Sequence, residues 1–112
     1  LEESTPFRIY EGPSISLIIS GVGKMQVAAA MGYLQALTGN LAQTAWLNVG
    51  IAGHSSLPLG SGVIAHQIKD EASGKRYYPV FVVDRPVATA SILTVEKPEK
   101  HYGEAQTVYD ME

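Results

Sequence analysis

The chain has 112 residues and a formal net charge of −3. Hydrophobic residues make up 46% of it, and it contains no cysteine. These values exclude a disordered segment, a disulfide-bonded scaffold and a thiolate metal site, and the acidic balance disfavours nucleic-acid binding. No apolar run is long enough to span a membrane, and the absence of cysteine is typical of a cytoplasmic protein.

The first half of the chain is predicted to form a strand–helix–strand unit. Strands are expected at Arg8–Tyr10 and, with β-branched apolar residues, at Ser14–Ser20. A helix is expected at Met25–Thr38, where apolar residues recur at helical spacing and Gly39 follows in the position of a C-cap. A further strand at Ala45–Val49 then implies a right-handed parallel crossover.

The second half is predicted to consist mainly of strands. They are expected at Val63–Ile68, Tyr77–Val83, Ala88–Val95 and Thr107–Tyr109, with a short helix at Pro98–Ala105. The proline inside the second of these strands has no amide hydrogen, so we expect that strand at a sheet edge or bulge. The elements together predict the α/β class with a mixed sheet.

Charge is distributed very unevenly along the chain. Lys24 is the only charged residue between Gly12 and Ile68, a stretch of 57 residues. This pattern predicts either the middle of a sheet buried on both faces together with a subunit interface, or a subunit interface alone. A parallel sheet also needs more helices than the sequence provides. Since the chain begins at Leu1 rather than Met, we expect it to be a trimmed protein or part of a longer one.

The histidines and serines do not form a familiar catalytic or metal-binding pattern. His54, His66 and His101 lack ligand spacing, so we expect no metal site, and His54 is interpreted as a hydrogen-bonded loop residue. No G-x-S-x-G nucleophile elbow occurs.

Three segments at the carboxyl ends of predicted strands form a candidate pocket. They are Gly21–Gly23, Gly50–Gly53 and Asp110–Glu112. Ligands of open α/β sheets bind at this edge. Two of these segments have a simpler interpretation: the first is a tight turn beside Lys24, and the last is a solvated strand end with Asp110 and Glu112 on one face.

Four segments, in order, resemble the superfamily of purine nucleoside phosphorylases and methylthioadenosine nucleosidases. They are Ser20–Lys24 (SGVGK), Asn48–Gly53 (NVGIAG), Leu59–Ile64 (LGSGVI) and Asp110–Glu112 (DME). The resemblance covers a little over half of the chain. It implies a three-layer α/β/α sandwich around a mixed sheet, of which residues 1–112 form a single partial domain, incomplete at both ends.

The resemblance also implies cleavage of the N-glycosidic bond of a purine nucleoside. Glu112 would be catalytic, since a carboxylate that accepts hydrogen bonds from the ribose also stabilises the oxocarbenium-like sugar. Met111 would pack under the ribose, Val22 would lie near the sugar, and the backbone around Ile51–Gly53 would line the base. The implied substrate-binding residues are Val22, Ile51, Ala52, Gly53, Asp110, Met111 and Glu112.

Departures from the family pattern favour hydrolysis over phosphorolysis. Asn48 and Ile51 stand where hexameric phosphorylases have a basic residue and a hydroxyl for phosphate. We therefore expect no cofactor, with phosphate as an alternative co-substrate. The family's general acid follows the M-E motif and its glutamate precedes the matched region, so we expect the 112-residue chain alone to be inactive. The expected partners are a small nucleoside and further copies of the chain, with no membrane and no nucleic acid.

Two other interpretations remain open at this stage. One is a catalytically degenerate domain that binds a nucleoside or serves oligomerisation. The other is an unrelated α/β or interaction domain whose apolar middle serves assembly.

Overall fold

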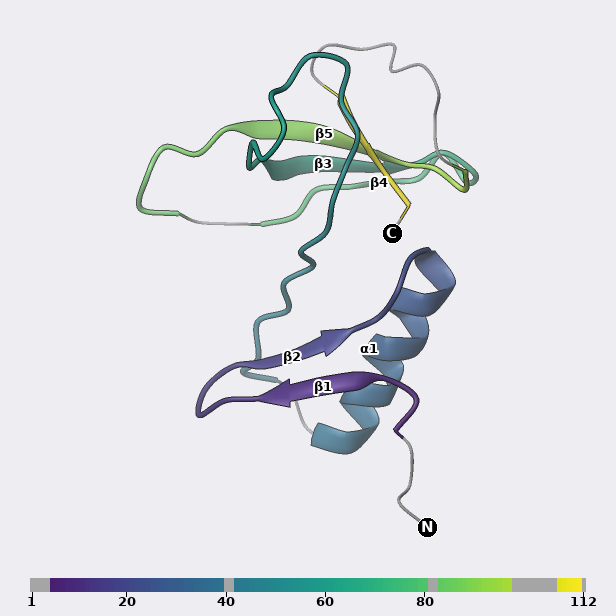
Figure 1. Cartoon of the computed structure of the whole chain (residues 1–112), viewed down its shortest axis with the longest axis vertical. Coiled ribbons are helices and arrows are strands. Elements are labelled where there is room, and N and C mark those ends of the chain that lie inside the picture. The colour runs from purple at the N-terminus through teal and green to yellow at the C-terminus, as the bar shows by residue number, and fades with distance from the viewer. Residues whose placement is uncertain (1–4, 40–41, 81–82, 98–106, 112) are drawn as a thin grey trace. The chain divides into compact units, whose positions relative to one another are not determined.

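A computed structural model of the chain describes residues 5–39, 42–80, 83–97 and 107–111 (Figure 1). The chain divides into two compact units, Leu1–Asn48 and Val49–Glu112. Each unit has its own secondary structure and is described by itself.

The first unit is an antiparallel hairpin with one helix packed against it. Strand β1 (Arg8–Glu11) pairs with β2 (Ser16–Ile19), and helix α1 (Lys24–Thr38) follows and packs against β2. Ala30 and Leu34 form the buried face of the helix. The structure confirms the predicted strands at Arg8–Tyr10 and Ser14–Ser20 and the predicted helix at Met25–Thr38.

Glycines mark both ends of α1. Gly21 and Gly23 have φ values of 91° and 103°, which side chains rarely adopt, so this turn between β2 and the helix favours glycine. Gly39, with a φ of 75°, donates its N–H to the carbonyl of Gln35 at 3.0 Å and ends the helix. The predicted C-cap is therefore confirmed.

The predicted strand at Ala45–Val49 is wrong. Residues 44–52 form no strand, and the boundary between the two units falls at Asn48. Within the described residues, β2 pairs with β1 and not with a later parallel strand, so the predicted crossover is also wrong. An apolar, β-branched pattern favours a strand, but a strand exists only where another strand offers its backbone hydrogen bonds.

The second unit is a mixed four-stranded sheet in the order β4-β3-β5-β6 (Figure 1). Its strands are β3 (Ile64–Asp70), β4 (Arg76–Tyr77), β5 (Thr89–Thr94) and β6 (Thr107–Asp110). Strands β3, β5 and β6 are parallel, and β4 runs antiparallel to β3. The predicted α/β class and mixed sheet are confirmed, as are the strands at Val63–Ile68, Ala88–Val95 and Thr107–Tyr109.

Strand β4 is much shorter than predicted. It stops at Tyr77, and residues 78–80 form no strand, although a strand was predicted over Tyr77–Val83. Pro79 lies two residues further on and has no amide hydrogen to donate, which explains the early end. The edge position was predicted correctly. The predicted helix at Pro98–Ala105 lies outside the described residues.

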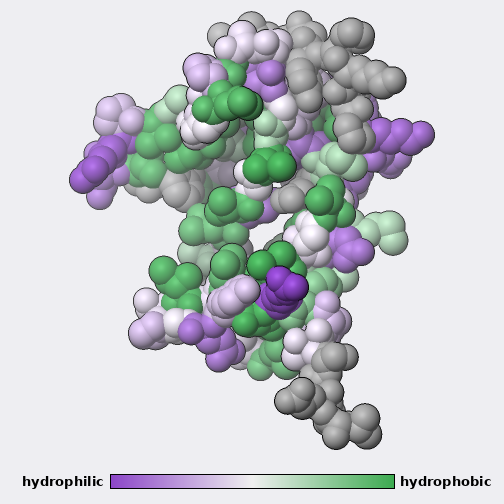
Figure 2. All heavy atoms as spheres, in the orientation of Figure 1, coloured by the Kyte–Doolittle hydropathy of each residue, from purple (hydrophilic) through white to green (hydrophobic). Residues whose placement is uncertain are grey.

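The apolar middle of the sequence supplies little of the buried core: among the described residues it contributes Ala30 and Leu34 in the first unit. Among the described residues, the buried apolar side chains of the second unit are Ala90, Val95 and Val108. Val49, Ile51 and Leu59 are instead almost fully exposed, and Figure 2 shows much apolar surface on the molecule. The prediction that the stretch Gly12–Ile68 forms the middle of a buried sheet is wrong for this chain.

Candidate functional site

The three parallel strands of the second unit end together at one edge of the sheet. Asp70, Thr94 and Asp110, the last residues of β3, β5 and β6, are neighbours in register. Two hydrogen bonds extend this edge: the N–H of Glu71 donates to the Thr94 carbonyl at 3.0 Å, and the N–H of Val95 donates to the Asp110 carbonyl at 2.8 Å. This is the edge at which open α/β sheets hold their ligands.

The segment that ends at Gly53 lies against the last strand of the sheet. The N–H of Gly53 donates to the Tyr109 carbonyl at 2.8 Å, and the N–H of Tyr109 donates to the Gly53 carbonyl at 2.9 Å. This antiparallel bridge brings the predicted segment Gly50–Gly53 beside Tyr109, the residue that precedes Asp110 and Met111 at the end of β6. The third predicted segment, Gly21–Gly23, belongs to the first unit.

The predicted site residues differ in exposure. Gly53, Asp110 and Met111 are half-buried, which suits residues that line a binding surface. Ile51 is 95% exposed, and Ala52 and Val22 are also exposed. Glu112, the predicted catalytic residue, lies outside the described residues.

His54 shapes the loop that follows Gly53. Its Nδ1 atom accepts hydrogen bonds from the N–H groups of Ser56 at 3.0 Å and Leu57 at 2.9 Å. The neutral ring therefore has its proton on Nε2. The prediction of a hydrogen-bonded loop histidine is confirmed.

Sequence reasoning missed a chain of polar side chains across β3 and β5. His66 lies at an irregularity in the β3 register, and its Nε2 is 3.3 Å from Ser91 Oγ. Ser91 donates to Gln67 Oε1 at 3.4 Å, and Gln67 Nε2 donates to the Tyr78 hydroxyl at 3.0 Å. The donor and acceptor roles of Ser91 Oγ and His66 Nε2 depend on the tautomer of the histidine ring. Because 24 residues separate Gln67 from Ser91, no local sequence motif indicates this row of hydrogen-bonded side chains.

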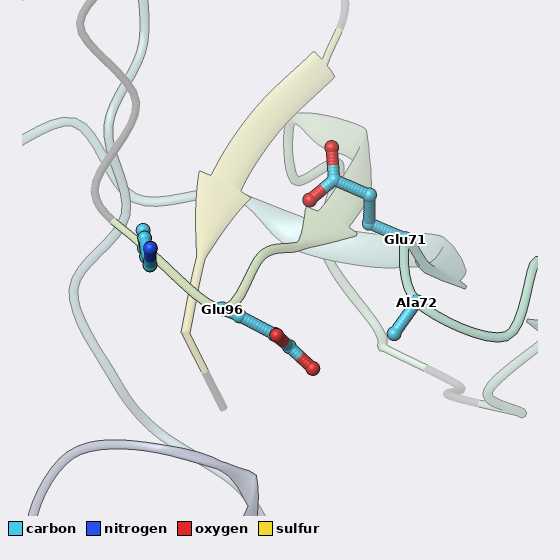
Figure 3. A pocket seen from close by; sticks show the side chains of 4 residues that line it. Glu71, Ala72 and Glu96 are labelled. Carbon is cyan, nitrogen blue, oxygen red and sulfur yellow. The ribbon is translucent and has the colours of Figure 1, made fainter.

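An open pocket of about 310 Å³ lies at the ends of β3 and β5 (Figure 3). It is lined by Glu71, Ala72, Glu96 and Lys97, all of which are exposed. The Glu71 and Glu96 side chains point in different directions (Figure 3), so their carboxylates do not converge on one ligand atom.

Neither a metal cluster nor a membrane helix occurs in the part of the chain that the structure describes. No three His, Cys, Asp or Glu side chains there are grouped to hold a metal ion. Helix α1 has 15 residues, which is too short to cross a bilayer, and none of the described residues form a longer helix.

Comparison with known proteins identifies no relative. No family model matches the chain, and neither the curated proteins nor the solved structures searched include a match.

Proposed function

We propose that the chain is the nucleoside-binding part of an enzyme that cleaves the N-glycosidic bond of purine nucleosides. Hydrolysis is favoured over phosphorolysis, because Asn48 and Ile51 offer phosphate neither a positive charge nor a hydroxyl. The three-layer sandwich, the cytoplasmic location and assembly into a homo-oligomer belong to the same proposal.

The observation that supports this proposal best is the pair of hydrogen bonds between Gly53 and Tyr109. Gly53, from one segment chosen from the sequence, bonds to Tyr109, 56 residues later and directly before the other chosen segment, at the carboxyl edge of a parallel sheet. A chance resemblance of short motifs predicts no such meeting. Asp110, at the end of β6, then follows directly after the residue that bonds to the segment expected to line the base.

The proposed chemistry needs few groups from this edge. The carboxylates of Asp110 and Glu112 accept hydrogen bonds from the sugar hydroxyls, and Met111 offers an apolar surface to the sugar ring. As the bond to the base breaks, positive charge develops on the sugar. A fixed carboxylate nearby stabilises that charge more than it stabilises the neutral substrate, and this difference lowers the barrier.

The test is calorimetric titration of the chain with adenosine and with inosine. We expect saturable binding of at least one nucleoside. Glu112→Gln should weaken it at least tenfold, because a hydrogen bond to a charged group contributes roughly 1.5–3 kcal/mol. Asp84→Asn changes an exposed carboxylate elsewhere in the second unit and serves as the control. Absence of saturable binding for both nucleosides would contradict the proposal.

The exposed apolar residues favour a second candidate, a domain that serves oligomerisation. Val49, Ile51 and Leu59 are exposed and lie close together in sequence, and soluble monomers rarely tolerate large contiguous apolar patches. Analytical ultracentrifugation separates the candidates. Self-association without nucleoside binding supports the second candidate, whereas nucleoside binding by the chain supports the first.

A further inference from the structure

The hydroxyl of Thr94 is buried without a hydrogen-bond partner among the described residues. Thr94 is 2% exposed, and its buried Oγ1 atom makes no hydrogen bond to any described residue. Buried hydroxyls in proteins are almost always paired, and an unpaired one destabilises the fold. An exception of this kind at the ligand edge of a sheet calls for a functional explanation.

The sheet register shows which groups lie beside Thr94. Its direct neighbours are Asp70 on β3 and Asp110 on β6, and residues in register on parallel strands project to the same face. The Asp70 carboxylate accepts hydrogen bonds from the N–H and the hydroxyl of Ser73, and so holds the turn that follows β3. Asp110 lies on the other side, next to Met111 and the bridge to Gly53.

A small rearrangement would bring the Thr94 hydroxyl to Asp110. Adjacent strands are about 4.8 Å apart, and rotation of threonine about χ1 moves its hydroxyl between staggered positions. A carboxylate has two oxygens and about four acceptor positions, so it can accept this bond in addition to others.

We propose that Thr94 is a positioning residue, whose hydroxyl donates to the Asp110 carboxylate when a nucleoside is bound. The inference rests on the proposed function. The bond orients Asp110 so that its remaining acceptor positions face the hydroxyls of the sugar. Without ligand the hydroxyl has no partner among the described residues, and in the nucleoside complex Asp110 becomes its partner. The Thr94 hydroxyl therefore lowers the stability of the unliganded protein and raises its affinity for the nucleoside.

Thr94→Val tests this inference, because valine has nearly the same shape and no hydroxyl. We expect the melting temperature of the unliganded chain to stay unchanged or rise, and the affinity for adenosine or inosine to fall about tenfold. Thr94→Ser should restore the affinity. The matched control is Thr107→Val, a buried threonine at the other end of β6, which should leave the affinity unchanged.

The outcomes separate this inference from the proposed function. If a nucleoside binds the unmodified chain and the Thr94→Val variant equally well, the inference is overturned and the proposed function stands. If Thr94→Val lowers the melting temperature, the hydroxyl has a structural partner, which also overturns the inference. If neither nucleoside binds the unmodified chain, the proposed function fails and the role of Thr94 fails with it.

Discussion

The two units contain similar numbers of apolar residues but differ in how these residues are buried. In the second unit, β5 has a neighbour on each side, and Ala90, Val95 and Val108 are buried around it. In the first unit, α1 carries no charge after its first residue, yet only Ala30 and Leu34 are buried. An apolar sequence thus indicates what must be covered, whereas pairing and packing partners determine what is covered. The second unit contains more of its own partners than the first.

The largest effect is expected in the interior of the second unit. Val108→Asp places a carboxylate at a position that is 3% exposed in β6. Burial of an unpaired charge should destabilise this unit by more than about 3 kcal/mol. Urea denaturation followed by circular dichroism measures the loss. Val80→Asp, at an exposed position of the same unit, should change stability by less than about 0.5 kcal/mol. Equal effects at the two positions would show that β6 is not part of a core.

A smaller effect is expected in the first unit. Leu34→Ala removes one of the two buried side chains of α1 and should cost about 2–3 kcal/mol. Trp46, the single tryptophan, belongs to this unit, so its fluorescence during urea denaturation reports the change. Leu37→Ala, on the exposed side of the same helix, is the control and should have little effect. A larger loss from Leu37 than from Leu34 would show that another surface covers α1.

The smallest effect is expected at the bridge that completes the candidate site. Gly53→Pro removes the N–H that donates to Tyr109 and should cost about 1–2 kcal/mol. Gly53→Ala keeps the donor, and Gly53 is not among the glycines with positive φ, so this control should lose less. Thermal denaturation monitored by circular dichroism compares the two variants. Identical melting temperatures would mean that the bridge contributes nothing to the second unit.

Most elements could be predicted from the sequence because their signals are local. Helix α1 has helical spacing and a terminal glycine, and β5 is a short apolar run between turns. The failed strand at Ala45–Val49 has an equally good local pattern, but within the described residues no neighbouring strand pairs with it. The predicted strand at Tyr77–Val83 was only partly correct, because Pro79 interrupts pairing where β4 would continue.

The candidate site divides in the same way. The sequence grouped Gly53 with Asp110 because both follow predicted strands, and carboxyl ends of parallel strands meet at one edge. The strand before Gly53 does not form, and Gly53 reaches β6 through an antiparallel bridge instead. The bridge from Gly53 to Tyr109 could not be predicted, and neither could the chain from His66 to Tyr78 nor the unpaired hydroxyl of Thr94. Each depends on residues that are distant in sequence and that the sheet brings together.

The sequence by itself determined the α/β class, the positions of the helix and most strands, and the acidic end of β6, because these depend on residue type and spacing within a few positions. Only the tertiary structure decided which strands pair, which apolar residues are buried and that Thr94 lies between Asp70 and Asp110. Those features depend on the register between strands, which no local pattern specifies.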